Sequence, residues 1–273
     1  MISFPNAKIN IGLNILRRRN DGYHDIETIF YPVKLRDILE IIANPPDNHL
    51  PAFQNTGLQM EVPLDKNLCI KAYRLLQKEF KLPEISIHLH KIIPFGAGLG
   101  GGSSDAVFTL NLLNNIFSLG LAKNKIQNYA LMLGSDCFFF TENEPIIARG
   151  RGELIEHVDL SLTGYNIIIV KPQFGISTIE AYSEVIPHKS ACNLEDSIQT
   201  PIEKWPELIV NDFEKHLFDK YPKLPKIKEK LYKIGASYAS MSGSGSAIYG
   251  IFKDELDITD LFPGCFVWKG IME

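Results

Sequence analysis

Apolar and polar residues alternate over much of the first third of the chain, a pattern typical of strands with one face in a core. The alternation predicts strands over residues 7–16, 26–33 and 37–42, with a turn at 18–22 between the first two. The segment 85–92 alternates in the same way, which predicts a further strand with one face toward solvent. Because buried parallel strands are apolar on both faces, this pattern favours an antiparallel sheet.

Segments with helical periodicity lie between these predicted strands and after them. Residues 68–80 and 125–133 predict helices, and the second of these is expected to end at Gly134. The short apolar segments 137–140 and 146–148 predict strands. A further helix is predicted by apolar residues that recur at i, i+4, i+7 and i+11, namely Ala106, Leu110, Leu113 and Phe117.

The pattern begins again after Val158, and a chain of 273 residues is long enough for two domains. We place a boundary near 159–163, which gives an N-terminal domain, 1–160, and a C-terminal domain, 161–273. Both halves mix strands and helices without regular β-α alternation, so the expected fold class is α+β. The second half predicts strands at 165–170, 247–253 and 264–268 and helices at 178–185, 207–218 and 223–234, and the polar segments 44–49 and 187–190 predict loops.

A glycine-rich loop lies between the predicted strand 85–92 and the helix that follows it. Five of the seven residues 96–102 are glycine, and Ser103, Ser104 and Asp105 come next as candidate helix caps. Glycines let a ligand approach the backbone closely, and successive N–H groups can form a concave nest for an anion. A helix N-terminus also favours phosphate. The loop therefore predicts a polyphosphate cradle, and the alternative is a flexible linker.

Three common nucleotide-binding classes fit this loop poorly. Residues 96–101 match G-x-G-x-x-G, but the alternating strand before them and the absence of a strand ending in an acid about 20 residues on disfavour a dinucleotide-binding unit. The loop lacks the lysine of a P-loop. The H-R-D and D-F-G triplets of protein kinases are absent from the chain.

Composition and charge narrow the function further. The formal net charge is −4, so no basic field favours nucleic acid or an anionic membrane as a partner. The first ten residues do not resemble a signal peptide, and no apolar run approaches the ~18 residues of a membrane helix. Four scattered cysteines without a C-x-x-C pair indicate neither zinc nor a disulfide framework, which favours a reducing cytoplasm.

Polar side chains at two places suggest catalytic chemistry. Lys8 and Asn10 lie on one face of the first predicted strand. The Lys8 ammonium group is either positioned to stabilise a phosphoryl group or exposed to solvent. Asp136 precedes an apolar run, so it is either a turn or cap residue or an acceptor that orients a substrate hydroxyl.

Two turns suggest binding surfaces. The turn 21–25 carries Tyr23 and His24, which form either an ordinary surface turn or a platform for a planar ring. A second glycine cluster, 242–246, is either a simple loop or a wall of the same site as the first glycine loop.

Together these motifs resemble the GHMP kinase superfamily, and the resemblance runs the length of the chain. It implies a ribosomal-S5-like N-terminal domain and a ferredoxin-like C-terminal domain with the active site in the cleft between them. The chain departs from the usual pattern at Asn6, at 137–138, and at Ser242 and Ser244. The segments that carry the resemblance are 7–10, 18–27, 94–107, 133–136 and 242–245.

The Asp-Gly-Tyr-His turn at 21–24 makes the chain similar to the branch of the superfamily whose substrate carries cytidine. The resemblance implies phosphorylation, by ATP with Mg²⁺, of the 2-hydroxyl of 4-diphosphocytidyl-2-C-methyl-D-erythritol in non-mevalonate isoprenoid biosynthesis. It implies Lys8 and Asp136 as catalytic residues. It implies an ATP site of Asn67, Lys91, Pro94, Gly96, Ala97, Gly98, Leu99, Gly100, Gly101, Gly102, Ser103 and Ser104. It implies a substrate site of Asn10, Tyr23, His24, Asp136, Thr178, Tyr182, Gly243 and Ser244.

The sequence is also compatible with two alternatives. One is a superfamily kinase that acts on mevalonate, homoserine or a sugar, and the other is a nucleotide-binding regulator without catalysis. We expect no dedicated metal site, no nucleic acid or membrane partner, and a monomer or weak homodimer.

Overall fold

The computed structural model describes residues 1–43, 52–60, 63–188, 192–258 and 260–273. The chain divides into two compact units. Unit 1 comprises residues 1–7, 35–94 and 100–143, and unit 2 comprises residues 8–34, 95–99 and 144–273. Each unit is assembled from separate segments of the chain, so the two units differ from domains divided at residue 160. That domain boundary stays a prediction.

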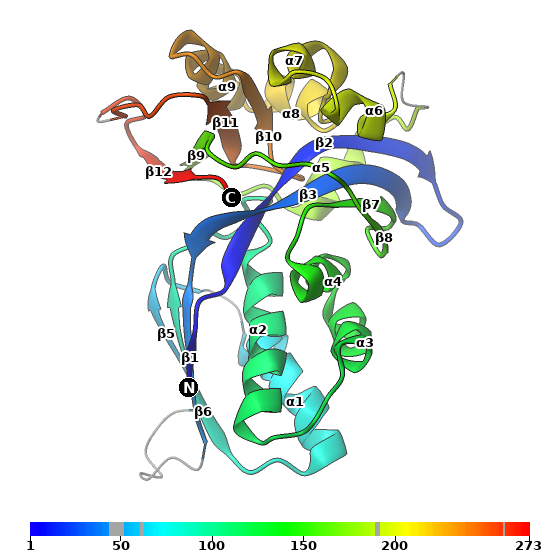
Figure 1. The fold of residues 1–273 in the computed structure, drawn as a ribbon, viewed down its shortest axis with the longest axis vertical. Helices are drawn as coiled ribbons and strands as arrows, with labels where there is room; N and C mark the ends of the chain where they lie inside the picture. Colours follow the sequence, from blue (N-terminus) through cyan, green and yellow to red (C-terminus); the bar gives the residue numbers. More distant parts are fainter. Residues whose placement is uncertain (44–51, 61–62, 189–191, 259) are drawn as a thin grey trace. The chain divides into compact units, whose positions relative to one another are not determined.

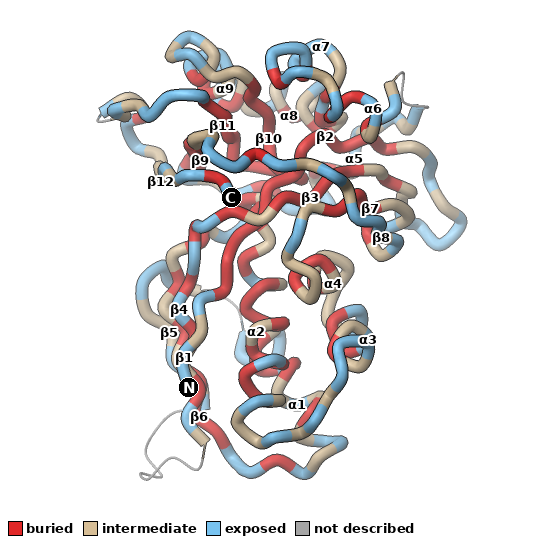
Figure 2. The backbone as a smooth tube through the Cα atoms, in the orientation of Figure 1, coloured by how far each residue is buried: buried red, intermediate tan, exposed pale blue. Residues whose placement is uncertain are grey.

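Unit 1 contains a sheet in the order β1-β4-β6-β5, and helices pack on one of its faces. β4 and β6 are antiparallel, whereas β5 runs parallel to β6. Figure 1 shows α1 and α2 side by side, and Figure 2 shows α2 buried along most of its length. The strands are β1 (Ile2–Ser3), β4 (Ile38–Ala43), β5 (Phe53–Gly57) and β6 (Ile85–Lys91), and the helices are η1 (Leu64–Lys66), α1 (Leu68–Phe80), α2 (Gly101–Ile116), α3 (Lys123–Leu133) and α4 (Ser135–Glu142).

The alternation seen in the sequence places one face of this sheet in a core. Leu39 and Ile41 of β4 are fully buried, whereas Ile38 and Ile42 are partly exposed on the other face. Two expectations for unit 1 are wrong. Residues 137–140 belong to α4 and not to a strand, because an unbroken apolar run carries no period that separates the two structures. α2 begins at Gly101, so residues 103–105 lie inside its first turns and do not cap it.

Unit 2 contains two antiparallel sheets, one in the order β2-β3-β7-β8 and one in the order β10-β11-β9-β12. Its strands are β2 (Asn6–Arg18) and β3 (His24–Arg36), which lie almost wholly in this unit, β7 (Ile146–Gly150), β8 (Leu154–His157), β9 (Asn166–Pro172), β10 (Tyr238–Met241), β11 (Ile248–Phe252) and β12 (Cys265–Ile271). Its helices are α5 (Thr178–Ser183), α6 (Leu194–Ile198), η2 (Ile202–Lys204), α7 (Trp205–Leu208), α8 (Glu214–Lys220) and α9 (Lys223–Lys233).

The helix expected at 207–218 is interrupted in its middle. The chain leaves α7 at Ile209 and re-enters a helix at Glu214, and in between Asn211 forms an isolated parallel bridge with Leu13. The predicted loop 44–49 and the residues 189–190 of the predicted loop 187–190 lie outside the described residues. Across the described ranges, no helix is both long and apolar enough to cross a membrane.

Candidate active site

The first half of the glycine loop, residues 96–99, is held by backbone hydrogen bonds within unit 2. The N–H groups of residues 246 and 247 donate to Gly96 O at 3.0 Å and Ala97 O at 3.2 Å. On β2, Lys8 N donates to Leu99 O at 3.0 Å. The segment is therefore held on two sides, which is inconsistent with a flexible linker.

Gly98 lies directly against the second glycine cluster. Its φ is +71°, and a Cβ built there would lie 1.8 Å from Ser242 O. The Ser242 hydroxyl donates to Gly98 O at 2.8 Å and accepts a hydrogen bond from Asn10 N at 3.1 Å. Gly243 is close as well, because its Cβ would lie 3.0 Å from Asn10 Oδ1. The structure thus brings 242–243, Asn10 and Gly98 together.

We expect Gly98→Ala to lower the unfolding free energy by about 2 kcal/mol or more, because the left-handed φ and the clash with Ser242 O both oppose a side chain. The KM for ATP should rise with it. Thermal unfolding and steady-state kinetics test this. Gly102→Ala is the matched control, since its nearest neighbour, Leu68 Cδ1, would be 3.9 Å away and alanine favours the helix. Equal destabilisation by both variants would contradict the argument.

The second half of the loop begins α2 in unit 1. Gly100 is the N-cap with a φ of +70°, and it has no side chain to cap the helix. The first N–H groups of a helix have no intrahelical acceptor, so the turn from Gly101 to Ser103 offers donors to an anion. The buried Ser104 hydroxyl has no hydrogen-bond partner among the described residues.

Lys91 lies buried beneath this helix start. Its ammonium group pairs with the Asp37 carboxylate and lies 3.1 Å from Asp105 Oδ2. Asp37 Oδ1 also accepts hydrogen bonds from the N–H groups of residues 92 and 93, at 2.5 and 2.8 Å. A Cβ on Gly101 would lie 2.8 Å from Lys91 Nζ. The Lys91 side chain, 1% exposed, is thus a buried support beneath the start of α2, and a contact of Lys91 with ATP stays a prediction.

Asn67 and Pro94, the other residues proposed for the ATP site, are also in unit 1. Asn67 is buried, and its side-chain oxygen caps α1 by accepting from Cys69 N at 2.9 Å and Ile70 N at 3.3 Å. Pro94 is half-buried, three residues after the end of β6. A contact of either residue with adenine stays a prediction.

We expect the stability of the protein to fall between pH 5 and pH 8 in a way that depends on Asp105. Burial raises the pKa of Asp105 to about 7, although Lys91 opposes the shift. In the unfolded chain the carboxyl titrates near ~3.9. Between these values the folded state binds more protons, so its stability decreases as the pH rises.

Urea unfolding midpoints at pH 5, 6.5 and 8 measure this dependence. Asp105→Asn should show a smaller decrease than the natural protein. The control is Asp65→Asn, which changes an exposed acid of η1 and should keep the natural dependence. Identical pH dependences for Asp105→Asn and the natural protein would contradict the assignment.

Lys8 and Asn10 lie buried on β2, 3% and 2% exposed, so Lys8 does not face solvent. Lys8 Nζ donates to Asn10 Oδ1 at 2.5 Å and lies 4.7 Å from the centre of the Phe30 ring. Asn10 Nδ2 donates to Thr28 Oγ1 at 2.9 Å, and the Thr28 hydroxyl donates to Gly12 O. These bonds fix the position of a buried cation.

Asp136 lies in the first turn of α4 in unit 1, and it is half-buried. An acid at this position is favoured by the helix dipole. The neighbouring Cys137 is buried, and burial raises the pKa of its thiol to about 12, so the thiol stays protonated. Lys8 belongs to unit 2, and an approach between Lys8 and Asp136 stays a prediction.

His24 and Tyr182 lie against each other in unit 2. Their rings stack with centroids 4.8 Å apart and an interplanar angle of 19°. Burial lowers the pKa of His24, which keeps its imidazole neutral at pH 7. Tyr23 is exposed, and the Arg151 guanidinium lies 5.2 Å from its ring centre. Two of the three aromatic residues expected at cytosine are thus in contact.

The remaining proposed substrate residues are Thr178 and Ser244. Thr178 is exposed as the first residue of α5, directly after the capping Ser177. Ser244 is half-buried within the second glycine cluster.

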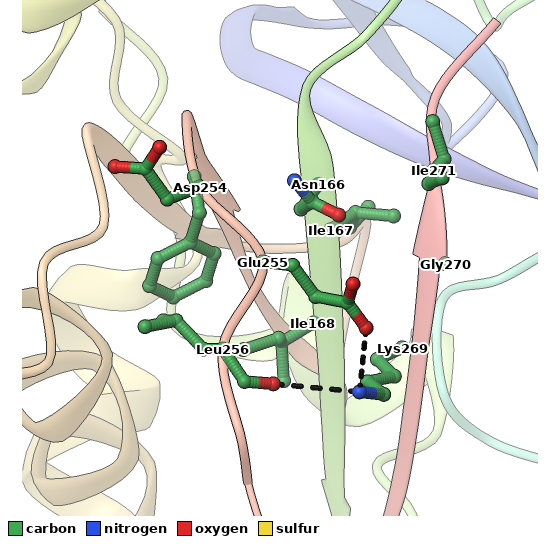
Figure 3. A pocket seen from close by; sticks show the side chains of 10 residues that line it. Asn166, Ile167, Ile168, Asp254, Glu255, Leu256, Lys269, Gly270 and Ile271 are labelled. Atoms are coloured by element: carbon green, nitrogen blue, oxygen red, sulfur yellow. Dashed lines mark hydrogen bonds and ion pairs between the residues drawn. The ribbon is translucent and has the colours of Figure 1, made fainter.

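A cavity of about 150 Å³ lies elsewhere in unit 2, beside β9 and β12 (Figure 3). Lys269 Nζ donates to Glu255 Oε1 at 3.0 Å and to Leu256 O at 3.4 Å along its wall. None of the proposed site residues lines it.

Sequence reasoning missed three residues that support the site: Asp37, Thr28 and the Ser242 hydroxyl. Asp37 holds the strand end before the loop, Thr28 holds Asn10, and Ser242 joins Asn10 to Gly98. Thr28 could have been found, because it lies in a predicted strand otherwise rich in apolar residues. The partners of Asp37 and Ser242 are far away in the sequence.

Comparison with known proteins gives the family. The models for the GHMP kinases N terminal domain and the GHMP kinases C terminal match residues 67–143 and 195–261. A 4-diphosphocytidyl-2-C-methyl-D-erythritol kinase of Bacteroides fragilis is 48% identical over 270 residues, which are 98% of each chain. The chain belongs to the GHMP kinase family. It is therefore an ATP-dependent small-molecule kinase.

Two further similarities agree with this assignment to the GHMP kinases. The relative from Azobacteroides pseudotrichonymphae, of the same name as that of B. fragilis, is 51% identical over 254 residues, 93% of this kinase and 94% of the relative. A crystal structure of 4-(cytidine 5'-diphospho)-2C-methyl-D-erythritol kinase superposes with a TM-score of 0.78 at 28% identity, covering 100% of this kinase and 99% of that chain. The expected α+β GHMP kinase fold is confirmed.

Proposed function

We propose that this kinase transfers the γ-phosphoryl group of ATP to the 2-hydroxyl of 4-diphosphocytidyl-2-C-methyl-D-erythritol, in non-mevalonate isoprenoid biosynthesis. The hydroxyl oxygen forms a bond to the γ-phosphorus, the bond from phosphorus to the β,γ-bridging oxygen breaks, and ADP leaves. The hydroxyl proton passes to Asp136. The products are the 2-phosphate and ADP.

The stack of His24 with Tyr182 carries this proposal. A phosphate cradle suits any kinase of the family, whereas a pair of rings suits a substrate with a planar base. A neutral His24 can also donate and accept hydrogen bonds at the edge of cytosine. The relatives that carry the cytidine name, at 48 and 51% identity, add support.

In this mechanism the chain acts by position and charge. Residues 96–104 direct backbone N–H groups at the phosphates, and Lys8 stabilises the charge that develops during transfer. Asn10 holds the Lys8 ammonium in place. Mg²⁺ enters with ATP as part of the substrate and neutralises phosphate charge. Among the described residues, no group of three or more histidine, cysteine, aspartate or glutamate side chains could hold a metal ion of its own.

ADP formation by the purified protein tests the proposal, with Mg-ATP and either the cytidine substrate, mevalonate, homoserine or galactose. Turnover with the cytidine compound alone supports it. Turnover with another acceptor supports the prediction that the glycine loop binds phosphate and rejects the proposal that the site recognises cytidine. ATP binding without turnover of any acceptor favours a regulator.

We also propose that the enzyme acts in the reducing cytoplasm, as a monomer or weak homodimer. The buried thiols of Cys69 and Cys137, neither in a disulfide, support the first part. Sedimentation across a concentration series tests the second.

A further inference from the structure

The segment 211–214, with the sequence Asn-Asp-Phe-Glu, comprises the three residues before α8 and the first residue of α8, and it contacts several parts of the candidate site within unit 2. Its residues were not among the proposed site residues. Each of its four side chains makes a specific contact, and together the contacts reach four elements: β2, α5, α9 and β10.

Asn211 holds the turn that carries the second glycine cluster. Its side chain is 3% exposed, and Nδ2 donates to Met241 O and to Gly243 O, at 2.8 Å each. Its Oδ1 accepts from Phe213 N at 3.0 Å. Both amide hydrogens are thus used on the carbonyls that flank Ser242, the residue that joins Asn10 to Gly98.

Glu214 holds the strand that leads into the same turn. Its Oε1 accepts from Met241 N at 2.8 Å and from the Ser240 hydroxyl at 3.1 Å. Its Oε2 accepts from Lys228 Nζ at 2.6 Å, which balances the charge. Asn211 and Glu214 therefore fix both sides of Met241.

Asp212 holds β2 beyond Asn10. Its N–H donates to Leu13 O at 2.9 Å, and its Oδ2 accepts from Ile15 N at 2.6 Å. The register of β2 against the segment is set by these two bonds and by the bridge from Leu13 to Asn211. Because Asn10 lies three residues before Leu13, its position follows that register.

Phe213 supports the aromatic pair. Its side chain is 1% exposed, and its ring meets the Tyr182 ring edge to face, with centroids 4.8 Å apart and an angle of 88°. Tyr182 in turn stacks on His24. An edge-to-face contact fixes the plane of Tyr182, and thereby the plane that it offers to a base.

We propose that the segment 211–214 is a positioning element that aligns the two ends of the substrate site. Asn211 and Glu214 set the turn 241–243 at the phosphoryl end, and Phe213 sets Tyr182 at the cytosine end. The inference rests on the proposed function. Its residues act through Ser242, Asn10 and Tyr182 and do not touch the reacting atoms.

Two variants separate the two ends. Asn211→Asp keeps the shape but places a carboxylate against two carbonyl oxygens, so the turn should shift and kcat should fall about 10- to 100-fold with little change in the KM for the cytidine substrate. Phe213→Leu should raise that KM about three- to tenfold and leave kcat and the KM for ATP nearly unchanged.

Leu224→Ala is the control, because Leu224 is fully buried in the same apolar cluster as Phe213 but belongs to α9 and lies outside the segment 211–214. It should lower the melting temperature without changing either KM. If Asn211→Asp is recovered unfolded, Asn211→Ser removes the amide without adding charge and takes its place. The proposal would be overturned if Asn211→Asp changed only the KM for the cytidine substrate and Phe213→Leu changed only kcat. It would also be overturned if all variants lost kcat equally with unchanged KM values.

Binding of cytidine diphosphate, measured by calorimetry, separates this inference from the proposed function. A natural protein that forms no ADP from any acceptor defeats the proposed reaction. Weaker binding of cytidine diphosphate by Phe213→Leu than by Leu224→Ala would still support positioning of Tyr182. Equal binding by the two variants would reject it.

Discussion

Replacing Asp136 with asparagine should lower kcat for ADP formation by about 10²- to 10⁴-fold, with the KM for ATP changed only severalfold. Asparagine keeps the shape of the side chain and its place in the first turn of α4, but it cannot accept the hydroxyl proton. Because Asp136 is half-buried and asparagine occupies nearly the same space, the variant should stay folded. Steady-state kinetics with the cytidine substrate, alongside a thermal melt, measure both quantities.

Glu142→Gln is the matched control for Asp136. Glu142 is an acid on the same helix, where it accepts hydrogen bonds from Lys123 and Gln127, and its replacement should leave kcat nearly unchanged. Asp136→Ala adds a further distinction. A lower kcat for alanine than for asparagine indicates that the side chain also orients the hydroxyl, and near-natural turnover in either variant would remove Asp136 from the mechanism.

Lys8→Met should lower kcat by about 10²- to 10³-fold, the effect expected when one preorganised charge is lost from a site of phosphoryl transfer. Methionine keeps the apolar stem that packs beside Phe30 but leaves Asn10 Oδ1 without its donor. The loss of that hydrogen bond should cost about 1–3 kcal/mol of stability, which a urea titration measures. The loss of turnover should exceed any loss of folded protein.

An exposed lysine of the neighbouring strand β3 provides the control for Lys8. Lys34→Met should keep kcat, because the Lys34 side chain is 39% exposed and pairs with the C-terminal Glu273. A higher KM for ATP with unchanged kcat in Lys8→Met would show that Lys8 binds the ground state and does not act in transfer.

Local sequence patterns predicted the parts of the site that depend on local structure. Alternation located β2, β3 and β6, and the glycine spacing located the loop before α2. The same patterns failed where tertiary packing decides. Residues 137–140 form a helix because three of the four, Cys137, Phe139 and Phe140, are buried against its neighbours.

The supporting hydrogen bonds could not be predicted either, because their partners are far apart in the chain. Ser242 and Gly98 are 144 residues apart, and Asp37 and Lys91 are 54 residues apart. The helix expected at 207–218 is interrupted at Asn211, because the Asn211 side chain donates hydrogen bonds to the backbone carbonyls of residues 241 and 243. No local period records such a pair, so these supporting contacts cannot be read from the sequence alone.

The contact between the His24 and Tyr182 rings competes with the binding of a base. With centroids 4.8 Å apart, the two rings already occupy the faces that a base would need, so a base enters between them only after they separate. Losing one aromatic contact costs about 0.5–1.5 kcal/mol, a factor of about 2 to 10 in affinity. Truncating Tyr182 would remove a ring that stacks on the bound base. It would also remove the ring that competes with the base for the face of His24. The measured loss of affinity would then understate how strongly the bound base is held.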